Sequence, residues 1–581
     1  MSHTPNYDAK IKALLDATPL GERTCPLTGE TWNFDERELA WCRQFNAPRL
    51  DYSPRTQMKI LGGFRSMFEI FWNKHAFSGE SILAYVHPDS PVRVVSDLEA
   101  HEFDPTTVSS AQADIDLTVS TLSIIQGILP HVPIGARREW RGIFNTIGVG
   151  LINVEDSYMV FSAVQVKRCL YCYYALEDSE DMVQSIFHVA STNCFGCSQV
   201  NRMYSCVFAI ESRDCMNGSF IYDCRNCEYV FGGVNLRNKK YIWFNEQLTK
   251  EEWEQKRSAV DLSCWSVFEE QRKALHGLIA HSVIPENFNH NSPDCTGEYL
   301  IDCVRSQDCF YCIECTDCFH LEGSRGGQSC AYVCAVWPAS NTWMSAVIED
   351  SNDVKYSFYC SKSQGIEYCY NCHDCEYLFG CVGLHKKKFH IFNKPYTEEE
   401  YWKKVDALKC GMLGRGEYGM FFDQEWSPAG MQFSHSAFWY EMSEEEMRAF
   451  GAPMYDPDRG AVLAPKKGQE MSPLNIADVP DCIGDVEASE WVGKPFMDQE
   501  ARRRWAVVPQ EFAYLKAHKL PFPREHYSSR LRRQIQMLNL IDTEETICAS
   551  CQKHLRVHKN KTFKNRKIYC QLCYLKYLET R

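Results

Sequence analysis

Short apolar runs separated by small polar residues fill the middle of the chain. Runs such as SCVFAI, GSFIYD, EYVFGG and VKYSFYC are β-prone, and Ser, Asn, Asp and Gly punctuate them. Cys197, Cys206, Cys215 and Cys224 recur every nine residues between these runs. A short strand and a tight turn, repeated, predict a β-solenoid, and two nine-residue units would make a coil of about eighteen residues.

The same pattern occurs twice in the chain. Residues 222–253 and 370–401 align without a gap at a constant offset of 148 residues. In each copy a basic loop leads into a strand and then into a helix with a capping box, formed by Thr249 and Glu252 or by Thr397 and Glu400. We therefore expect two solenoid blocks, each closed by a capping helix.

A second duplication brackets the solenoid blocks. Residues 38–55 and 511–530 share the pattern Pro-Arg-x-x-Tyr-Ser-x-Arg, and spaced pairs of polar residues follow each copy. The expected fold is mainly β with capping helices (α+β), a duplicated cysteine-rich β-solenoid flanked by zinc-ribbon-like modules. The predicted domains are 1–105, a degenerate zinc-ribbon-like module; 106–150, a connector; 151–280 and 281–409, β-solenoid blocks 1 and 2 with their capping helices; 410–500, an extended connector; and 501–581, a C-terminal module with a zinc ribbon.

Cysteine usage and the N-terminus bear on the compartment. The first twenty residues lack a basic start followed by an apolar core, and no apolar run approaches the length of a membrane span. We expect a cytoplasmic protein without membrane contact. Its 30 cysteines are then expected to be thiols or metal ligands rather than a disulfide framework.

The pattern CxxC…CxxC near the C-terminus is the strongest chemical signal. Cys548, Cys551, Cys570 and Cys573 form two pairs on tight turns, and four thiolates suit a tetrahedral ion. Zn²⁺ is the expected cofactor, in a structural role, because four protein ligands leave no open catalytic position. The aligned N-terminal positions are His75, Ser78, Ser96 and Glu99, so a complete ligand set is expected only at the C-terminus.

The loop between the two C-terminal pairs is basic. It holds seven Lys or Arg and no acid, and residues 516–581 carry a net charge of +10 in a chain of −14. Phosphate contacts are predicted for Lys559, Lys561, Lys564, Arg566 and Lys567, with Phe563 and Tyr569 available for base stacking. An equally weighted alternative is a basic hairpin that docks on the acidic remainder of the protein.

The solenoid cysteines allow two interpretations. Eight lie in 169–227 and thirteen in 295–381. We favour a ladder of buried packing residues, because Cys is among the most buried residue types. The alternative is a metal or redox array, for which Cys309, Cys312, Cys315 and Cys318 are the densest group and a possible additional metal site.

No catalytic set is evident from the sequence. His188, His320, His373 and His390 are candidate bases for a Cys nucleophile, but no spacing singles out a dyad. Asp350 and Asp353 are better explained as turn residues than as paired catalytic carboxylates.

Several stretches resemble a family of uncharacterised cysteine-rich zinc-ribbon proteins of reduced-genome bacteria. The matching segments are CPLTGE (25–30), YCYNCHDCEYLFGCVGL (368–384), KKKFHIFNKPYTEEEY (386–401), YGMFFDQEWSP (418–428) and LPFPREHYSSR before the C-terminal Cys pairs. No activity is established for that family. Of its N-terminal ribbon ligands this chain keeps only Cys25.

Three functions remain open from the sequence. The first is a non-enzymatic, zinc-stabilised scaffold or adaptor that binds another macromolecule, with a protein as the expected partner. The second is nucleic-acid binding through the basic C-terminal ribbon. The third is a thiol-based metal-handling or redox protein.

Overall fold

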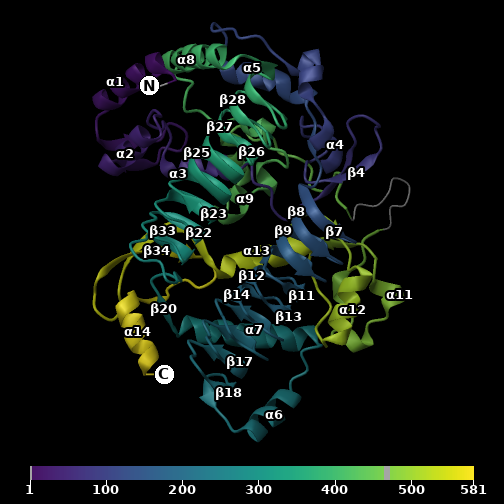
Figure 1. Ribbon diagram of the computed structural model, residues 1–581. Helices are drawn as coiled ribbons and strands as arrows, with labels where there is room; N and C mark the ends of the chain where they lie inside the picture. Colours follow the sequence, from purple (N-terminus) through teal and green to yellow (C-terminus); the bar gives the residue numbers. More distant parts are fainter. Residues whose placement is uncertain (1–2, 463–471, 581) are drawn as a thin grey trace. The chain divides into compact units, whose positions relative to one another are not determined.

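The computed structural model describes residues 3–462 and 472–580 (Figure 1). The chain is mainly β and divides into two compact units. Unit 1 comprises Met1–Met67, Trp72–Ala136 and Asn289–Tyr455, and unit 2 comprises Phe68–Phe71, Arg137–Phe288 and Asp456–Arg581. Each unit contains one solenoid block, so the duplication in the sequence is also a duplication of structure.

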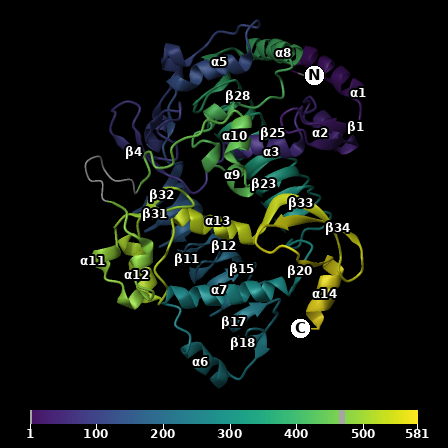
Figure 2. The ribbon, with the colours of Figure 1, turned by 180° about the vertical axis from the view of Figure 1, so that it is seen from behind.

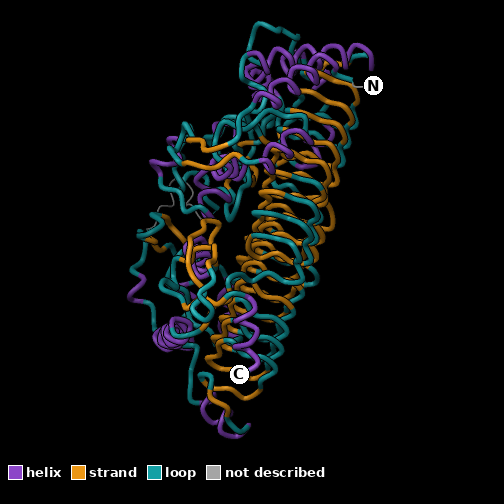
Figure 3. The backbone as a smooth tube through the Cα atoms, turned by 90° about the vertical axis from the view of Figure 1, so that its left-hand side faces the viewer, coloured by secondary structure: helices purple, strands orange, loops and turns teal. Residues whose placement is uncertain are grey.

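Parallel strands stack as coils within each unit (Figure 3). In unit 2 they are β7 (Glu139–Phe144), β8 (Ile147–Glu155), β9 (Tyr158–Lys167), β10 (Leu170–Leu176), β11 (Ser179–Val183), β12 (Ile186–Val189), β13 (Thr192–Phe195), β14 (Ser198–Asn201), β15 (Val207–Ile210), β16 (Ser219–Tyr222), β17 (Glu228–Val234) and β18 (Lys240–Trp243). In unit 1 they are β21 (Gly297–Ile301), β22 (Cys309–Ile313), β23 (Phe319–Arg325), β24 (Gly327–Gln328), β25 (Ala331–Lys355), β26 (Phe358–Ser361), β27 (Gln364–Glu367), β28 (Glu376–Phe379) and β29 (Lys388–Ile391).

The coil is shorter than the sequence pattern predicts. Val207 pairs with Ser219, and Ser219 pairs with Phe231, so the chain returns to the same position after twelve residues. Gln364, Glu376 and Lys388 repeat this register in unit 1. The expected coil of about eighteen residues is therefore wrong. The nine-residue cysteine interval is three quarters of one coil.

Each coil has four sides of three residues. Every third residue has a left-handed backbone conformation, as at Ser205, Phe208, Glu211 and Asp214, with φ between +51° and +56°. Such conformations are uncommon for residues other than Gly, and here they turn the chain at regular intervals. Cys206, which follows the turn residue Ser205, is fully buried in the solenoid core.

Small side chains fill the interior and bond to the backbone. Ser212 Oγ donates to the Ile210 carbonyl at 2.9 Å and accepts the Cys224 N–H of the next coil at 3.1 Å. Cysteine makes the same contacts, since the Cys206 N–H donates to Cys194 Sγ at 3.4 Å. Burial also raises the pKa of the Cys224 thiol well above its ordinary value. The prediction that the solenoid cysteines are buried is confirmed, except that Cys295 is only half-buried.

Substitution of the buried solenoid cysteines is expected to show whether they are packing residues or whether they bind metal or react as thiols. Cys206→Ala, Cys215→Ala and Cys360→Ala should each lower the free energy of unfolding by about 1–2 kcal/mol through a small cavity. Cys206→Leu should cost more, about 3 kcal/mol, because the corner has no room for added carbons. Denaturant titration measures both effects. Alkylation should be slow and metal content unchanged, and rapid alkylation of the folded protein would contradict the packing role.

The two solenoid blocks end alike. In unit 2, β19 (Glu246–Gln247) precedes α6 (Lys250–Ser258), and in unit 1, β30 (Lys394–Pro395) precedes α8 (Glu398–Gly414). Both predicted capping boxes are present. Asn245 and Asn393 are left-handed, and their side-chain oxygens accept backbone N–H groups at 2.8 and 2.9 Å. These matched contacts explain why the two asparagines occupy equivalent positions.

One pair of cysteines departs from the expectation of free thiols or metal ligands. Cys264 and Cys482 form a disulfide within unit 2. Cys264 lies immediately before α7 (Trp265–Ala280), which packs on β16 and β17 (Figure 2). Across the described residues, none of the helices combines the length and apolar character needed to cross a membrane.

Candidate metal centre

The C-terminal cysteines lie on a hairpin and a helix. Strands β33 (Asn539–Ile547) and β34 (His554–Asn560) form an antiparallel hairpin whose turn contains Cys548 and Cys551. Strand β35 (Lys567–Tyr569) then leads into α14 (Gln571–Glu579). Cys570 is the N-cap of that helix, and Cys573 lies in its first turn. The predicted CxxC pairs thus occupy two tight turns.

The four sulfur atoms converge. Their Sγ atoms all lie within 4.8 Å of one another, and Cys551 Sγ is 3.7 Å from Cys570 Sγ. Cys548 and Cys570 are buried, whereas Cys551 is exposed. The Cys570 N–H donates to Cys548 Sγ at 3.2 Å, which ties the second turn to the first. The arrangement can hold one metal ion with four sulfur ligands.

The electrostatics of the cluster fit a cation. Burial raises the pKa of Cys548, but backbone N–H groups of Cys551, Cys570 and Ser550 outweigh it and lower that pKa to about 6. The Cys573 N–H lowers the pKa of Cys570, but burial and the neighbouring sulfurs outweigh it and raise that pKa to about 12. One thiolate is therefore favoured and a second is disfavoured. A bound cation removes that penalty, because it neutralises the accumulated charge.

Two further hairpins in unit 1 share this turn. The first residue of each turn donates its N–H to the carbonyl five residues on and accepts from the N–H four residues on. The residue four positions on is left-handed in all three turns. The three sets are Cys25, Gly29 and Glu30; His75, Gly79 and Glu80; and Cys548, Gln552 and Lys553.

The second hairpin has hydrogen-bonded polar side chains at the positions where the C-terminal module has cysteines. It comprises β3 (Phe71–Lys74), β4 (Ser81–Ala84) and α4 (Asp97–Glu102). His75 Nε2 lies 2.8 Å from a Glu99 carboxylate oxygen, and Ser78 Oγ lies 3.1 Å from His75 Nδ1. Ser96 caps α4 and bonds to the same carboxylate. The structure therefore brings together His75, Ser78, Ser96 and Glu99, as the sequence alignment of the two ends predicts.

The first hairpin reveals residues that the sequence reasoning missed. It comprises β1 (Gly21–Thr24), β2 (Thr31–Phe34) and α3 (Pro54–Gly62), and Ser53 caps the helix. Cys25 Sγ donates to Thr56 Oγ1 at 3.4 Å, and Ser53 Oγ donates to the same hydroxyl at 3.0 Å. Burial raises the pKa of Cys25, but hydroxyls of Thr28 and Thr56 outweigh it and lower that pKa to about 7. The spacing Ser53-x2-Thr56 was the available signal.

The possible second metal site has a different environment. Cys309, Cys312, Cys315 and Cys318 are buried in the core of the unit 1 solenoid. Their thiols donate to carbonyls, as Cys309 Sγ does to Gln307 at 3.3 Å. In the described part of the chain, the ligand-atom groups that converge within 4.8 Å do not include this set. Metal binding there stays a prediction.

A buried polar group in unit 1 also escaped the sequence reasoning. Single ligand atoms of Glu322, Cys334 and His435 lie within 4.8 Å of one another. Tyr440 donates a short hydrogen bond to Glu322, and His435 Nε2 lies 2.9 Å from the same carboxylate. The Arg65 guanidinium lowers the pKa of Cys334 while burial, the larger effect, raises it to about 12. A guanidinium this close disfavours an added cation.

The predicted phosphate-contacting residues of the ribbon differ in solvent exposure. Lys559, Lys561, Lys564 and Lys567 are exposed. Arg566 is different, because it donates to Asn539 Oδ1 at 2.5 Å and to the His558 carbonyl at 2.6 Å and so holds the hairpin together.

The aromatic residues of the basic loop are not equally accessible. Phe563 is buried, with its ring 5.2 Å from His276 and 6.0 Å from Tyr222. It does not offer the free face that base stacking needs. Tyr569 is half-buried.

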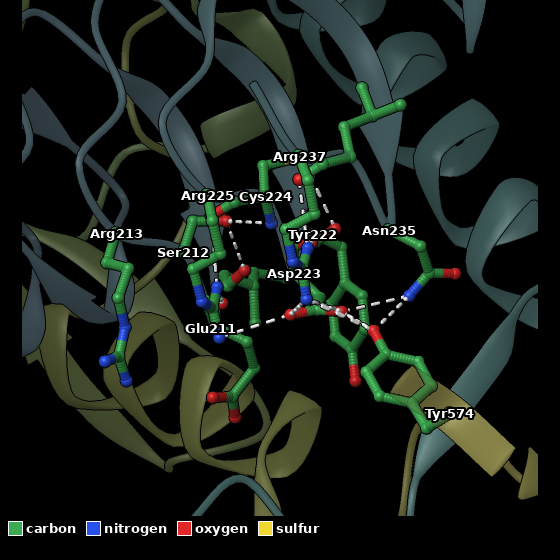
Figure 4. A network of polar contacts seen from close by, with 12 residues as sticks. Glu211, Ser212, Arg213, Tyr222, Asp223, Cys224, Arg225, Asn235, Arg237 and Tyr574 are labelled. Atoms are coloured by element: carbon green, nitrogen blue, oxygen red, sulfur yellow. Dashed lines mark hydrogen bonds and ion pairs between the residues drawn. The ribbon is translucent and has the colours of Figure 1, made fainter. Parts of the chain in front are cut away.

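The ribbon is fastened to the solenoid of unit 2 (Figure 4). Tyr574 of α14 donates a short hydrogen bond to the Asp223 carboxylate, and Asn235 Nδ2 donates to the Tyr574 hydroxyl at 3.0 Å. Arg237 and Arg225 lie 3.0 and 3.2 Å from the same carboxylate. The two guanidiniums compensate the buried charge of Asp223.

A backbone pairing adds to this attachment. Strand β35 pairs in parallel with β20 (Val283–Pro285), and the Gln571 N–H donates to Glu286 Oε1 at 2.9 Å. The four-cysteine ribbon therefore has a fixed orientation on its own unit.

Fold and cluster together define a β-solenoid protein that carries a four-cysteine ribbon able to bind a metal ion. No protein-family model matches the chain, and no curated protein matches its sequence. The resemblance to cysteine-rich zinc-ribbon proteins stays a prediction.

Proposed function

We propose that this protein is a non-enzymatic scaffold or adaptor of the cytoplasm, stabilised by one structural Zn²⁺, that binds another protein. The observation that carries the proposal is that the cysteines fall into two groups with different surroundings. Those of the solenoids pack against carbonyls in two cores, and the four of the ribbon converge as a closed ligand set. Stacked coils provide long surfaces suited to holding partners.

Metal stoichiometry and partner capture test this proposal. Native mass spectrometry of the purified protein should find about one zinc per chain, as one four-thiolate site requires. Crosslinking in cells, followed by size-exclusion chromatography, should then recover a complex with a defined protein partner. Many exchangeable ions per chain would instead support the thiol-based metal-handling function. Elution of the crosslinked protein alone would end the scaffold proposal.

Nucleic-acid binding is the second candidate, favoured by four exposed lysines on one hairpin module. We expect a combined change of Lys559, Lys561, Lys564 and Lys567 to Glu to abolish binding of a single-stranded oligonucleotide. The logarithm of the parent's affinity should fall with the logarithm of salt concentration with a slope of about −3, because four phosphate contacts each release most of a counterion. Fluorescence anisotropy at several salt concentrations measures this.

A matched charge reversal controls for net charge. Lys167, Lys250, Lys256 and Lys273 are exposed lysines of unit 2 outside the ribbon, and changing all four to Glu, which alters the net charge by the same amount, should leave binding intact. A parent protein that binds no oligonucleotide at low salt would remove this candidate.

A further inference from the structure

The outer face of α14 is apolar and uncovered in the structure. Leu572 is 74% exposed and Leu575 is 49% exposed. Together with exposed Lys576, they stand at positions i, i+3 and i+4, which share one side of a helix. Two exposed leucines on one side of a helix form a contiguous apolar patch, the kind of surface that marks interaction sites.

The orientation of this face is fixed. Tyr574 is buried and bonded to Asp223, and Gln571 is held by Glu286. The helix cannot rotate its leucines inward without breaking these contacts. Its first turn also carries Cys573, so a bound metal ion would hold the same face rigid. A rigid anchor loses little conformational entropy on binding.

The module that carries this face is basic, and Glu579, one turn beyond Leu575, is the acidic residue on that side of α14. Lys553 of the first turn, Lys567 of β35 and Lys576 of α14 are all exposed. Leucines on a basic module match an acidic segment that carries its own apolar side chains, since surface charges steer association and apolar anchors provide the affinity. Nucleic acid matches this face less well, because aliphatic side chains do not stack with bases as aromatic rings do.

The second hairpin module offers an internal comparison. Leu98 follows its N-cap Ser96 by two residues, as Leu572 follows Cys570, and it is 67% exposed. Its helix is acidic, with Asp97, Glu99 and Glu102. The same module geometry thus presents a leucine with opposite surrounding charge.

We propose that Leu572, Leu575 and Lys576 form a docking face for an acidic protein segment, on a module whose exposed Lys553 and Lys567 add positive charge. That segment presents two apolar side chains about one helical turn apart. The inference rests on the proposed scaffold function and assigns its partner's chemistry.

A peptide-display selection tests the face directly. The full-length, zinc-loaded protein is the bait for a library of random linear peptides, with counter-selection on the double variant Leu572→Glu, Leu575→Glu. Enriched peptides should combine Asp or Glu with Leu, Ile or Phe. Their affinity, measured by anisotropy, should fall roughly tenfold or more in the double variant, a typical hot-spot loss. Lys576→Glu should weaken binding and Leu98→Glu should not.

Three outcomes of the binding measurements in vitro would overturn the docking face. They are no enrichment over counter-selection, enriched peptides without acidic residues, and oligonucleotide binding that depends on the two leucines. Unchanged zinc content and thermal unfolding of the double variant show that it is folded. If the double variant still recovers the cellular protein partner in the crosslinking experiment, the docking-face proposal is wrong while the scaffold function stands. If the parent protein recovers no partner, the scaffold function itself is wrong.

Discussion

Changing Cys548 or Cys573 to Ser is expected to remove one metal ion per chain and to unfold residues 546–577, while both solenoid blocks remain folded. The module has a small core of Cys548, Leu555, Val557, Ile568 and Cys570. Structural zinc in such modules contributes roughly 10–16 kcal/mol of binding free energy, which is folding free energy. Metal analysis and hydrogen exchange measure the two effects.

Cys25→Ser is the matched control. Cys25 occupies the equivalent turn of the first hairpin, where hydroxyl groups of Thr28, Ser53 and Thr56 take the remaining positions. This change should leave metal content unaltered. Retention of the full metal content by either ribbon variant would refute the site. Loss of protection in the solenoid strands would show that the ribbon and its unit fold as one.

The repeated architecture was predictable because the same sequence pattern occurs twice in the chain. The constant offset, the two capping boxes and the alternation of short strands with small polar residues all indicated stacked coils. The coil length was not predictable in the same way. Apolar positions every third residue match neither the strand nor the helix period, and the turns fall on residues as unlike as Phe208 and Asp214. Only the register of paired strands reveals twelve residues per coil.

The four-cysteine cluster was predictable because its ligand residues are concentrated in one sequence motif. Two CxxC pairs specify their own geometry, and His75 to Glu99 could be aligned with them. The role of Arg566 could not be predicted. The sequence of a basic loop does not reveal which of its basic side chains donates hydrogen bonds to the protein's own carbonyl groups. Glu322, Cys334 and His435 are distant in sequence, and only tertiary packing brings them together.

Acid sensitivity is the second large effect that the structure implies. His188 of β12 is fully buried between Ala175 and Val200 of the neighbouring coils. Within the described residues neither ring nitrogen has a hydrogen-bond partner, and burial lowers the pKa of His188 to about 3. In the unfolded chain the His188 ring takes up a proton near its ordinary pKa of about 6.5. In the folded chain the same ring stays neutral until the pH falls to about 3. Stability is therefore lost as the pH falls through this window.

Replacing His188 by Leu should remove the contribution of His188 to this pH dependence. Between pH 7 and pH 4 the parent is expected to lose about 3 kcal/mol of unfolding free energy through His188 alone, at about 1.4 kcal/mol per pH unit below 6.5. The variant should lose that much less, as measured by urea titration at both pH values. His281→Leu, at an exposed ring, should leave the parent's pH dependence in place. Equal losses in His188→Leu and the parent would mean that His188 is hydrated or protonated in the folded protein.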